Sequence, residues 1–291
     1  MKKVFFVLLV FILHLYSCKN DRINEVIEFK SMNGFYDENK PVEQIFLITS
    51  DSINSSVVGV YGTELNGFRD ILQYPNGDSI PIPYEIRLIE LYSYKDMILY
   101  KMPSISDDSL LESYGKIKIT AWHNDTELEL RIREKYPVIL SSSPTKQGMH
   151  IFQGQHPNDK YGNWILSSDG SFINATTKYN LFTGKMGWQN CAQKLENIVT
   201  ADISIKVEGT GVEHIDLFLL VNSYHSVVIG ENLSIKSAPI GQKASLIAMA
   251  KDQNNRYRLH KSIITVSEGL EVKLDMNIVT EAELLSILSS L

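Results

Sequence analysis

The sequence has few cysteines and, beyond its first residues, no long apolar run. Only Cys18 and Cys191 occur among 291 residues, so at most one disulfide can form within the chain. No segment after Tyr16 is apolar over the length that a membrane-spanning helix needs. The fold must therefore be stabilised by its own cores, and 44% hydrophobic with 21% charged residues is a globular composition.

Motifs that mark common enzyme classes are also absent. The chain has no H-E-x-x-H, no G-x-S-x-G, no phosphate-binding loop, no G-x-G-x-x-G and no C-x-x-C. His123, His150 and His156 occur without carboxylates at metal-ligand spacing. We therefore expect no metal and no other cofactor, and we interpret the protein as a non-enzyme.

Basic residues are outnumbered and do not cluster. The chain carries 28 lysines and arginines against 34 acidic residues, a net charge of −6. Removal of an N-terminal segment containing Lys2 and Lys3 leaves 26 basic residues and a net charge of −8. A mildly acidic surface argues against nucleic acid and against anionic lipid headgroups as partners.

Residues 1–17 have the pattern of an export signal. Two lysines precede an apolar run that is too short to span a bilayer stably. Leu15 is too bulky for the outer recognition position of a general signal peptidase. The run ends in Leu15-Tyr16-Ser17-Cys18, which resembles the lipobox of bacterial lipoproteins and implies that Cys18 becomes an acylated first residue. An uncleaved anchor or a soluble secreted protein is the alternative.

Acyl chains on Cys18 would fix the mature protein to a membrane. Each buried CH₂ group contributes about 0.8 kcal/mol, so two or more chains give long-lived attachment. Residues 18–43 would form a polar tether and spacer. Cys191 would then lack a partner, and since no basic neighbour activates it, we expect a buried, inert thiol. The predicted localisation is the outer membrane, on either of its sides.

Residues 44–140 predict an antiparallel β-sandwich module. Short apolar runs alternate with turn residues such as Asn66-Gly67, and no helical periodicity appears before the C-terminus. Asn124-Asp125 would turn the segment 116–133 into one hairpin. Its first strand would alternate between a core face and a solvent face, the former with Ile117, Ile119 and Ala121, the latter with Lys116, Lys118 and Thr120.

Residues 141–190 are less regular, and we interpret them as a linker region between two modules. Loop-forming residues interrupt its apolar runs, and Trp188 near its end has the large apolar surface that seals a domain junction.

Residues 191–291 predict a second sandwich of immunoglobulin-like or transthyretin-like type. Six or seven short strands follow one another with turns between them. At the end of the chain, Thr280 and Glu283 have the spacing of a capping box for a short helix. Its apolar residues would dock on the sandwich, namely Leu284, Leu285, Ile287, Leu288 and Leu291.

Several segments together resemble one group of proteins. They are the stretch 84–98 with Asp96-Met97-Ile98, the segment Leu111-Glu112-Ser113-Tyr114-Gly115, and Gly187-Trp188-Gln189-Asn190-Cys191. The chain is similar in these segments to cell-envelope lipoproteins of unknown function from Bacteroidota. Ala238-Pro239-Ile240-Gly241 resembles their carboxypeptidase-regulatory-like module, which performs no peptidase chemistry. Tyr114, Gln189 and Ala192 depart from the usual residues. The resemblance implies a fold and a location but no activity.

Trp122 and Trp164 are the candidate ligand-binding residues. Exposed tryptophans stack on sugars, while buried ones pack in cores or interfaces, and either role is compatible with both positions. A coplanar exposed pair would favour a glycan, and burial would favour contact with a protein.

Three Asp-Ser triplets resemble acceptor sites for O-linked glycosylation in Bacteroidota. They are Asp51-Ser52-Ile53, Asp78-Ser79-Ile80 and Asp108-Ser109-Leu110.

The sequence thus predicts a lipid-anchored envelope protein that works by binding or scaffolding. Its partners would be the membrane, through the anchor, and either another envelope protein or a surface glycan. The alternative function is that of a carbohydrate-binding accessory lipoprotein in a nutrient-uptake system.

Overall fold

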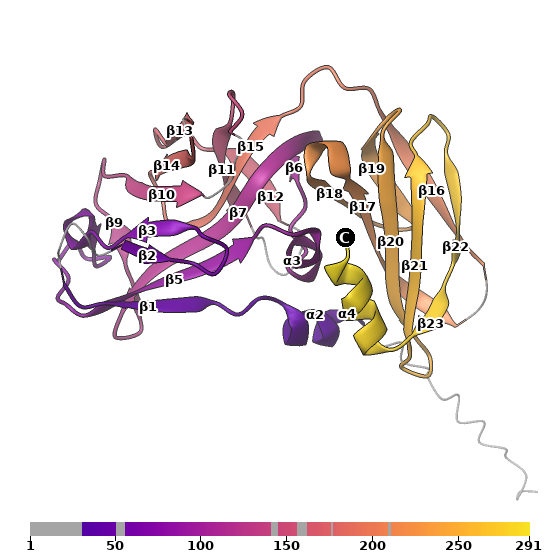
Figure 1. The fold of residues 1–291 in the computed structure, drawn as a ribbon, viewed down its shortest axis with the longest axis horizontal. Coiled ribbons are helices and arrows are strands. Elements are labelled where there is room, and N and C mark those ends of the chain that lie inside the picture. Colours follow the sequence, from indigo (N-terminus) through magenta and orange to yellow (C-terminus); the bar gives the residue numbers. More distant parts are fainter. Residues whose placement is uncertain (1–30, 51–55, 141–144, 156–161, 176, 209–210) are drawn as a thin grey trace, which may run out of the picture.

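The structure is all-β, as the sequence predicts. The computed structural model describes residues 31–50, 56–140, 145–155, 162–175, 177–208 and 211–291. These residues form four larger sheets and three short α-helices. Figure 1 shows two sandwiches side by side with the helices between them. The predicted lipobox, Leu15 to Cys18, lies outside the described residues.

The first sandwich packs a major sheet on a minor sheet. The major sheet has the order β1 (Gln44–Ile48), β5 (Tyr84–Leu91), β7 (Ser109–His123), β15 (Gly187–Lys194), β11 (His150–Gln155) and β12 (Asn163–Leu166). The minor sheet has the order β13 (Phe172–Ala175), β14 (Tyr179–Thr183), β10 (Tyr136–Leu140), β3 (Glu64–Asn66) and β2 (Ser56–Val58). Leu65, Ile86, Ile119, Val138 and Leu181 are among the residues buried between them.

The prediction that residues 141–190 form a linker region is wrong. Five strands, β11 to β15, lie in or begin in this range and complete both sheets of the first sandwich. The strand β15 pairs with β7, so that Trp188 lies opposite Lys118, seventy residues earlier in the chain. Such long-range pairing leaves little local pattern, because loops separate each short run from its neighbour. The first sandwich therefore extends to Lys194 instead of ending at residue 140.

The predicted hairpin over 116–133 is present only at its turn. Asn124 and Asp125 have φ angles of 45° and 61°, as a tight hairpin turn requires. The returning strand β8 (Thr126–Glu127) then pairs with β7 for two residues only. Leu128 is buried in the core, and β9 (Glu129–Leu130) pairs instead with β4 (Leu72–Gln73). The short strand β6 (Ile105–Ser106) pairs with the start of β7.

The second sandwich has eight strands in the described residues, where the sequence predicts six or seven after residue 191. One sheet has the order β19 (Ser234–Pro239), β16 (Thr200–Glu208) and β22 (Glu271–Asp275). The other has the order β18 (Ser226–Gly230), β17 (Val212–Val221), β20 (Lys243–Asp252), β21 (Tyr257–Thr265) and β23 (Asn277–Val279). All pairs are antiparallel except β16 with β22, which is parallel. Ile203, Leu219, Leu246 and Leu274 lie in the core between the sheets.

A third apolar cluster joins the two sandwiches, and we call it the junction core. It contains buried residues of the major sheet, of β17, β18, β20 and β21, and of the helices α2 (Asn33–Asn39), α3 (Tyr94–Leu99) and α4 (Glu281–Ser289). Representative members are Phe35, Leu91, Met97, Phe218, Ile247 and Leu284. The sandwiches are thus held together by a continuous apolar interior.

Helices α2 and α3 are not anticipated by the sequence pattern. They have seven and six residues, which is too short for helical periodicity to appear. The prediction that residues 18–43 form a polar spacer is wrong for α2, because Phe35 and Tyr36 are buried in the junction core. A capping box between Ser93 and Asp96 supports the start of α3, and two 3₁₀ turns, Arg69–Ile71 and Asn222–Tyr224, complete the helical elements. Packing in the junction core stabilises these short segments more than their intrinsic propensity does.

The C-terminal helix α4 is confirmed in detail. Thr280 Oγ1 accepts a hydrogen bond from the Glu283 backbone N–H at 3.2 Å, and Glu283 Oε2 accepts one from the Thr280 N–H at 2.7 Å. Leu284 and Leu288 are buried in the junction core, and Leu285, Ile287 and Leu291 pack against it.

Lys116 is completely buried beside the junction core, although the sequence places it on a solvent face. Of the three residues predicted on that face, Lys116 and Thr120 are buried and only Lys118 is partly exposed, and α3 and neighbouring segments cover the end of the strand that holds Lys116. Its Nζ atom lies 2.8 Å from the Met102 carbonyl oxygen and 2.9 Å from Ser104 Oγ. No carboxylate pairs with it among the described residues. Burial therefore lowers the pKa of Lys116 well below its ordinary value.

Replacing Lys116 with methionine tests this buried amine. The unfolded chain binds more protons than the folded one between the lowered pKa and the ordinary value of about 10.4, so native stability should rise with pH across that window. We expect Lys116→Met to flatten this rise and to stabilise the fold at neutral pH by roughly 1–4 kcal/mol. Urea unfolding at several pH values measures both effects. Lys118→Met on the same strand is the control, and equal pH slopes for Lys116→Met and the unmodified chain would contradict the assignment.

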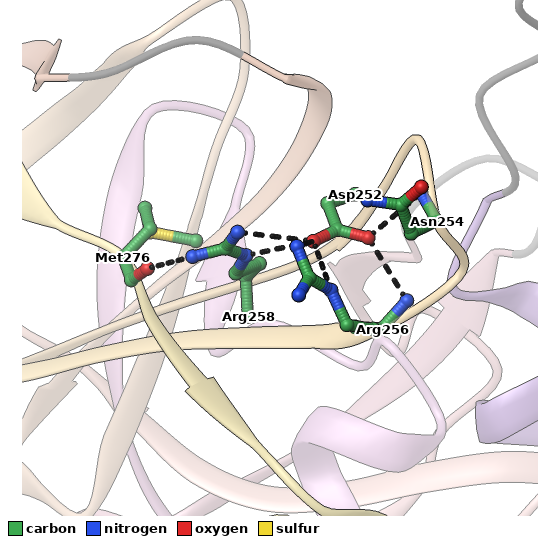
Figure 2. A network of polar contacts seen from close by, with 5 residues as sticks. All are labelled: Asp252, Asn254, Arg256, Arg258 and Met276. Carbon is green, nitrogen blue, oxygen red and sulfur yellow. Dashed lines mark hydrogen bonds and ion pairs between the residues drawn. The ribbon is translucent and has the colours of Figure 1, made fainter.

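The hairpin between β20 and β21 is organised around the buried carboxylate of Asp252 (Figure 2). Its Oδ1 accepts the backbone N–H groups of Asn254 and Arg256, and its Oδ2 accepts the Nε–H groups of Arg256 and Arg258 at 2.9 and 3.0 Å. Arg258 also donates to the carbonyl oxygen of Met276, which ties the hairpin to the segment before β23. Burial alone would raise the pKa of Asp252, but these hydrogen bonds outweigh it and lower the pKa.

Removing the Asp252 carboxylate should destabilise the second sandwich. We expect Asp252→Ala to lower the free energy of unfolding by about 2–3 kcal/mol near neutral pH, because it leaves several donors without their charged acceptor. Since the folded pKa is lowered, the stabilisation is present above the ordinary pKa of about 3.9 and is lost as the pH falls through the folded value. Thermal unfolding between acid and neutral pH measures this. Exposed Glu268→Ala is the matched control, and a deficit that persists unchanged in acid would argue against the charge as its cause.

Candidate binding cleft

The two candidate tryptophans do not form an exposed pair. Trp164 is fully buried, and its Nε1–H donates to the Pro103 carbonyl oxygen at 2.6 Å within the junction core. Trp122 is half-buried at the end of β7, and its Nε1–H donates to Thr120 Oγ1 at 2.9 Å. Burial of Trp164 removes it as a stacking residue, whereas Trp122 stays accessible.

Trp122 lies on a part of the major sheet that the junction core does not cover. The strand register aligns Leu47 with Glu85 and Glu85 with Trp122, and it aligns Ile45 with Arg87 in the next rung. Ile45 and Leu47 are 57% and 60% exposed. We call these five residues the open face.

Charged groups on the open face neutralise one another. Arg87 donates two hydrogen bonds to Glu85 Oε2, at 3.0 and 2.7 Å, and its Cζ atom lies 4.7 Å from the centroid of the Trp122 ring. Glu43 lies 3.9 Å from both Arg87 and Lys118. The side chains are thereby held in one arrangement without a net charge, which suits recognition of a polar, uncharged group.

The next rung of the sheet forms the floor of a cleft. Ile89 pairs with Lys118, Lys118 pairs with Trp188, and all three line a cavity of about 860 Å³. Helix α2, the segment after it and the end of α3 form its walls. The other lining residues are Asn33, Tyr36, Asp37, Lys40, Pro41, Val42, Glu43, Leu99, Tyr100 and Lys101.

Two aromatic side chains of the cleft, Tyr100 and Trp188, pack against each other. Tyr100 meets Trp188 edge to face at 5.6 Å, and its hydroxyl donates to the Pro41 carbonyl oxygen at 2.6 Å. Burial, followed by the charges of Glu43 and Asp96, raises the pKa of Tyr100 to about 12, so the phenol remains protonated.

Lysines at the rim of the cleft are also held in place. Lys40 Nζ lies 2.8 Å from Asp37 Oδ1 and 5.8 Å from the Tyr100 ring centroid. Lys101 Nζ donates to Asn33 Oδ1 at 3.1 Å and lies 4.4 Å from the ring centroid of Tyr36. The rim therefore offers oriented polar groups around an aromatic floor.

Sequence reasoning misses most of this site. Tyr36 lies in α2 and Tyr100 directly follows α3, two helices that the pattern does not reveal. Trp188 is recognised as a junction residue, and it does pack against the junction core, but it also lines the cleft. In the sequence, Tyr36 and Tyr100 each lie beside a short polar segment. This pattern alone does not predict a binding site.

The other predicted features lie elsewhere. His123 Nδ1 is 2.5 Å from the Tyr74 hydroxyl, His150 is exposed on β11, and His156 lies outside the described residues. Within the described part of the chain no three His, Cys, Asp or Glu side chains gather as metal ligands. Cys191 is buried as expected, and burial raises its pKa.

The three Asp-Ser triplets differ in accessibility. Ser79 is exposed, and its Oγ accepts a hydrogen bond from Arg131 at 3.0 Å. Ser109 is half-buried at the start of β7. The triplet with Ser52 lies outside the described residues.

Comparison with known proteins finds no significant match. No protein-family model matches the chain, and neither a curated protein nor a solved structure is significantly similar to it. Among the described residues no helix is both long enough and apolar enough to span a membrane.

Proposed function

We propose that this chain is a lipid-anchored protein of the cell envelope that binds another envelope protein or a surface polymer and catalyses no reaction. The anchor rests on the lipobox-like Leu15-Tyr16-Ser17-Cys18. The binding role rests on one observation, the aromatic-floored cleft that continues into the open face of the major sheet. Clefts with a few fixed polar groups over an aromatic floor are the usual form of recognition sites.

A protein partner agrees best with the burial of Trp164. The remaining contact surface combines exposed aliphatic side chains with paired charges and aromatic residues, a mixture typical of protein interfaces. The charged groups are already paired with each other, so we expect them to orient a partner and not to bind it through a net charge.

A carbohydrate ligand is the second candidate, and the position of Trp188 favours it. Trp122 and Lys118 are four residues apart on β7, so Trp122 and Trp188 lie about 13 Å apart along the same face. This spacing, with neutralised charges between the two rings, fits an oligosaccharide better than a single sugar.

The anchor is tested by mass spectrometry of the N-terminus combined with protease treatment of intact cells. We expect the mature chain to begin at Cys18 and to carry acyl chains. Release of body peptides from unbroken cells would place the protein on the surface, and protection until the outer membrane is broken would place it inside. An unmodified Cys18 within an uncleaved chain would refute the proposal.

The cleft is tested by photo-crosslinking from Val42, which lines it and is 86% exposed. A benzophenone side chain at this position of the full chain should give one discrete adduct in cells. Trp188→Ala should lower its yield about threefold to tenfold, because an aromatic contact is worth about 0.5–1.5 kcal/mol. The same side chain at Ile263, 75% exposed on the second sandwich, is the control.

The outcomes separate the two candidates. A protein adduct that depends on Trp188 supports a protein partner. Binding to a glycan that Trp122→Ala and Trp188→Ala both weaken, with no protein adduct, supports the carbohydrate role. Equal adducts from both positions, unchanged by Trp188→Ala, would count against a binding site in the cleft.

A further inference from the structure

The strand β1 is an exposed edge that lacks the usual protection. Its only strand partner among the described residues is β5, and the two pair over five residues without a bulge. The sequence Gln44-Ile45-Phe46-Leu47-Ile48 contains no charge and no proline. Natural sheets normally block such edges with lysine, proline, bulges or shortness, because an open edge pairs with other strands.

Other edge strands of the four larger sheets are protected in one of these ways or by burial. Strands β2 and β23 have three residues, and β12 and β13 have four. Strand β22 carries three charges, and β19 contains Lys236, Pro239 and a register shift. Strand β18 is largely buried beside α3. Within the described residues β1 is thus the exception.

Exposed apolar residues gather around this edge. Six of the fourteen large exposed hydrophobic residues in the described part of the chain lie within 42–61: Val42, Ile45, Leu47, Val58, Val60 and Tyr61. The backbone N–H of Val60 donates to Gln44 Oε1 at 2.9 Å, which places the residues after β2 beside β1. Figure 1 shows β1 and β2 along the same side of the first sandwich. This concentration marks a contact surface.

From this edge we infer that two copies of the chain pair through β1 in antiparallel orientation, joining their major sheets into one. A two-fold axis at Phe46 places Ile45 of each copy opposite Leu47 of the other, on the open face. Gln44 then meets Ile48, and Glu43 meets Thr49, so no like charges are opposed. Apolar cross-strand pairs of this kind stabilise antiparallel sheets.

A second copy is the occupant that this strand fits best, because the edge is complementary to itself. The symmetric pairing covers both open edges at once and closes the assembly at two chains, as isologous interfaces do. It also brings two open faces into one continuous surface. The inference goes beyond the proposed function and does not depend on what the cleft binds.

Cysteine pairs test the register. In the proposed dimer the Cα atoms of position 45 and position 47 of the other copy lie about 4.5–5.5 Å apart, within the range that a disulfide bridges. Two positions 45, or two positions 47, lie on a diagonal at about 7–8 Å, which is too far. We would co-express two differently tagged full chains, one with Ile45→Cys and the other with Leu47→Cys. Mild oxidation should then link unlike chains about tenfold more than like chains.

Matched variants complete the experiment. Exposed positions 263 and 265 on β21 provide the control, as Ile263→Cys in one chain and Thr265→Cys in the other. Without cysteines, the two tagged chains should co-purify, and Ile45→Lys with Leu47→Lys in both should reduce co-purification about tenfold, because it places charges on the edge. Ile263→Lys should leave it unchanged, and unchanged thermal unfolding would show that the lysine variant is folded.

Two results would overturn the inference. One is the absence of unlike-chain disulfides together with the absence of co-purification. The other is that the engineered cysteines of both chains form disulfides with a different protein, which would mean that the edge receives a foreign strand.

Discussion

The apolar junction between the two sandwiches is the contact on which the rest of the structure depends. It requires the major sheet to be buried on both faces, but only at one end. Along β5 the burial changes from alternating at Tyr84–Leu88 to continuous at Ile89–Leu91. The cleft forms where this covering stops, because helices α2 and α3 leave the next rung of the sheet partly open. The position of the candidate site is therefore a consequence of how far the junction reaches.

This constraint also explains how buried charges are treated. Asp252 lies in a hairpin at the rim of the second sandwich, where arginines reach it from neighbouring positions. Lys116 lies where helix α3 covers β7, and backbone, hydroxyl and thioether groups surround its amine. A carboxylate there would also need to be buried. The chain instead keeps one amine whose neutral form is favoured, at a cost in stability near neutral pH.

Local patterns were sufficient for some features of the fold and insufficient for others. The capping box of Thr280 and Glu283 and the turn at Asn124-Asp125 were predictable, because their causes lie within a few residues. The strands of 141–190 were not, since each is held by partners far away in the chain. The burial of Lys116 was not predictable either. Its side chain lies on the face of β7 that the pattern indicates, but the sequence gives no sign that a helix covers this face. Residues of α2, α3 and β15 line the cleft together, so no single segment of the sequence predicts it.

The order of the chain has a consequence for how the protein matures. Leu284 and Leu288, which belong to the junction core, lie in helix α4, which follows the strands of both sandwiches in the chain. Each sandwich can form its own core earlier, but the surface between them stays partly uncovered until helix α4 has been synthesised. A nascent chain therefore exposes part of the facing surfaces of both sandwiches during its synthesis. A product truncated before residue 281 would keep this apolar surface exposed. Helix α4 thus completes the apolar contact between the two sandwiches.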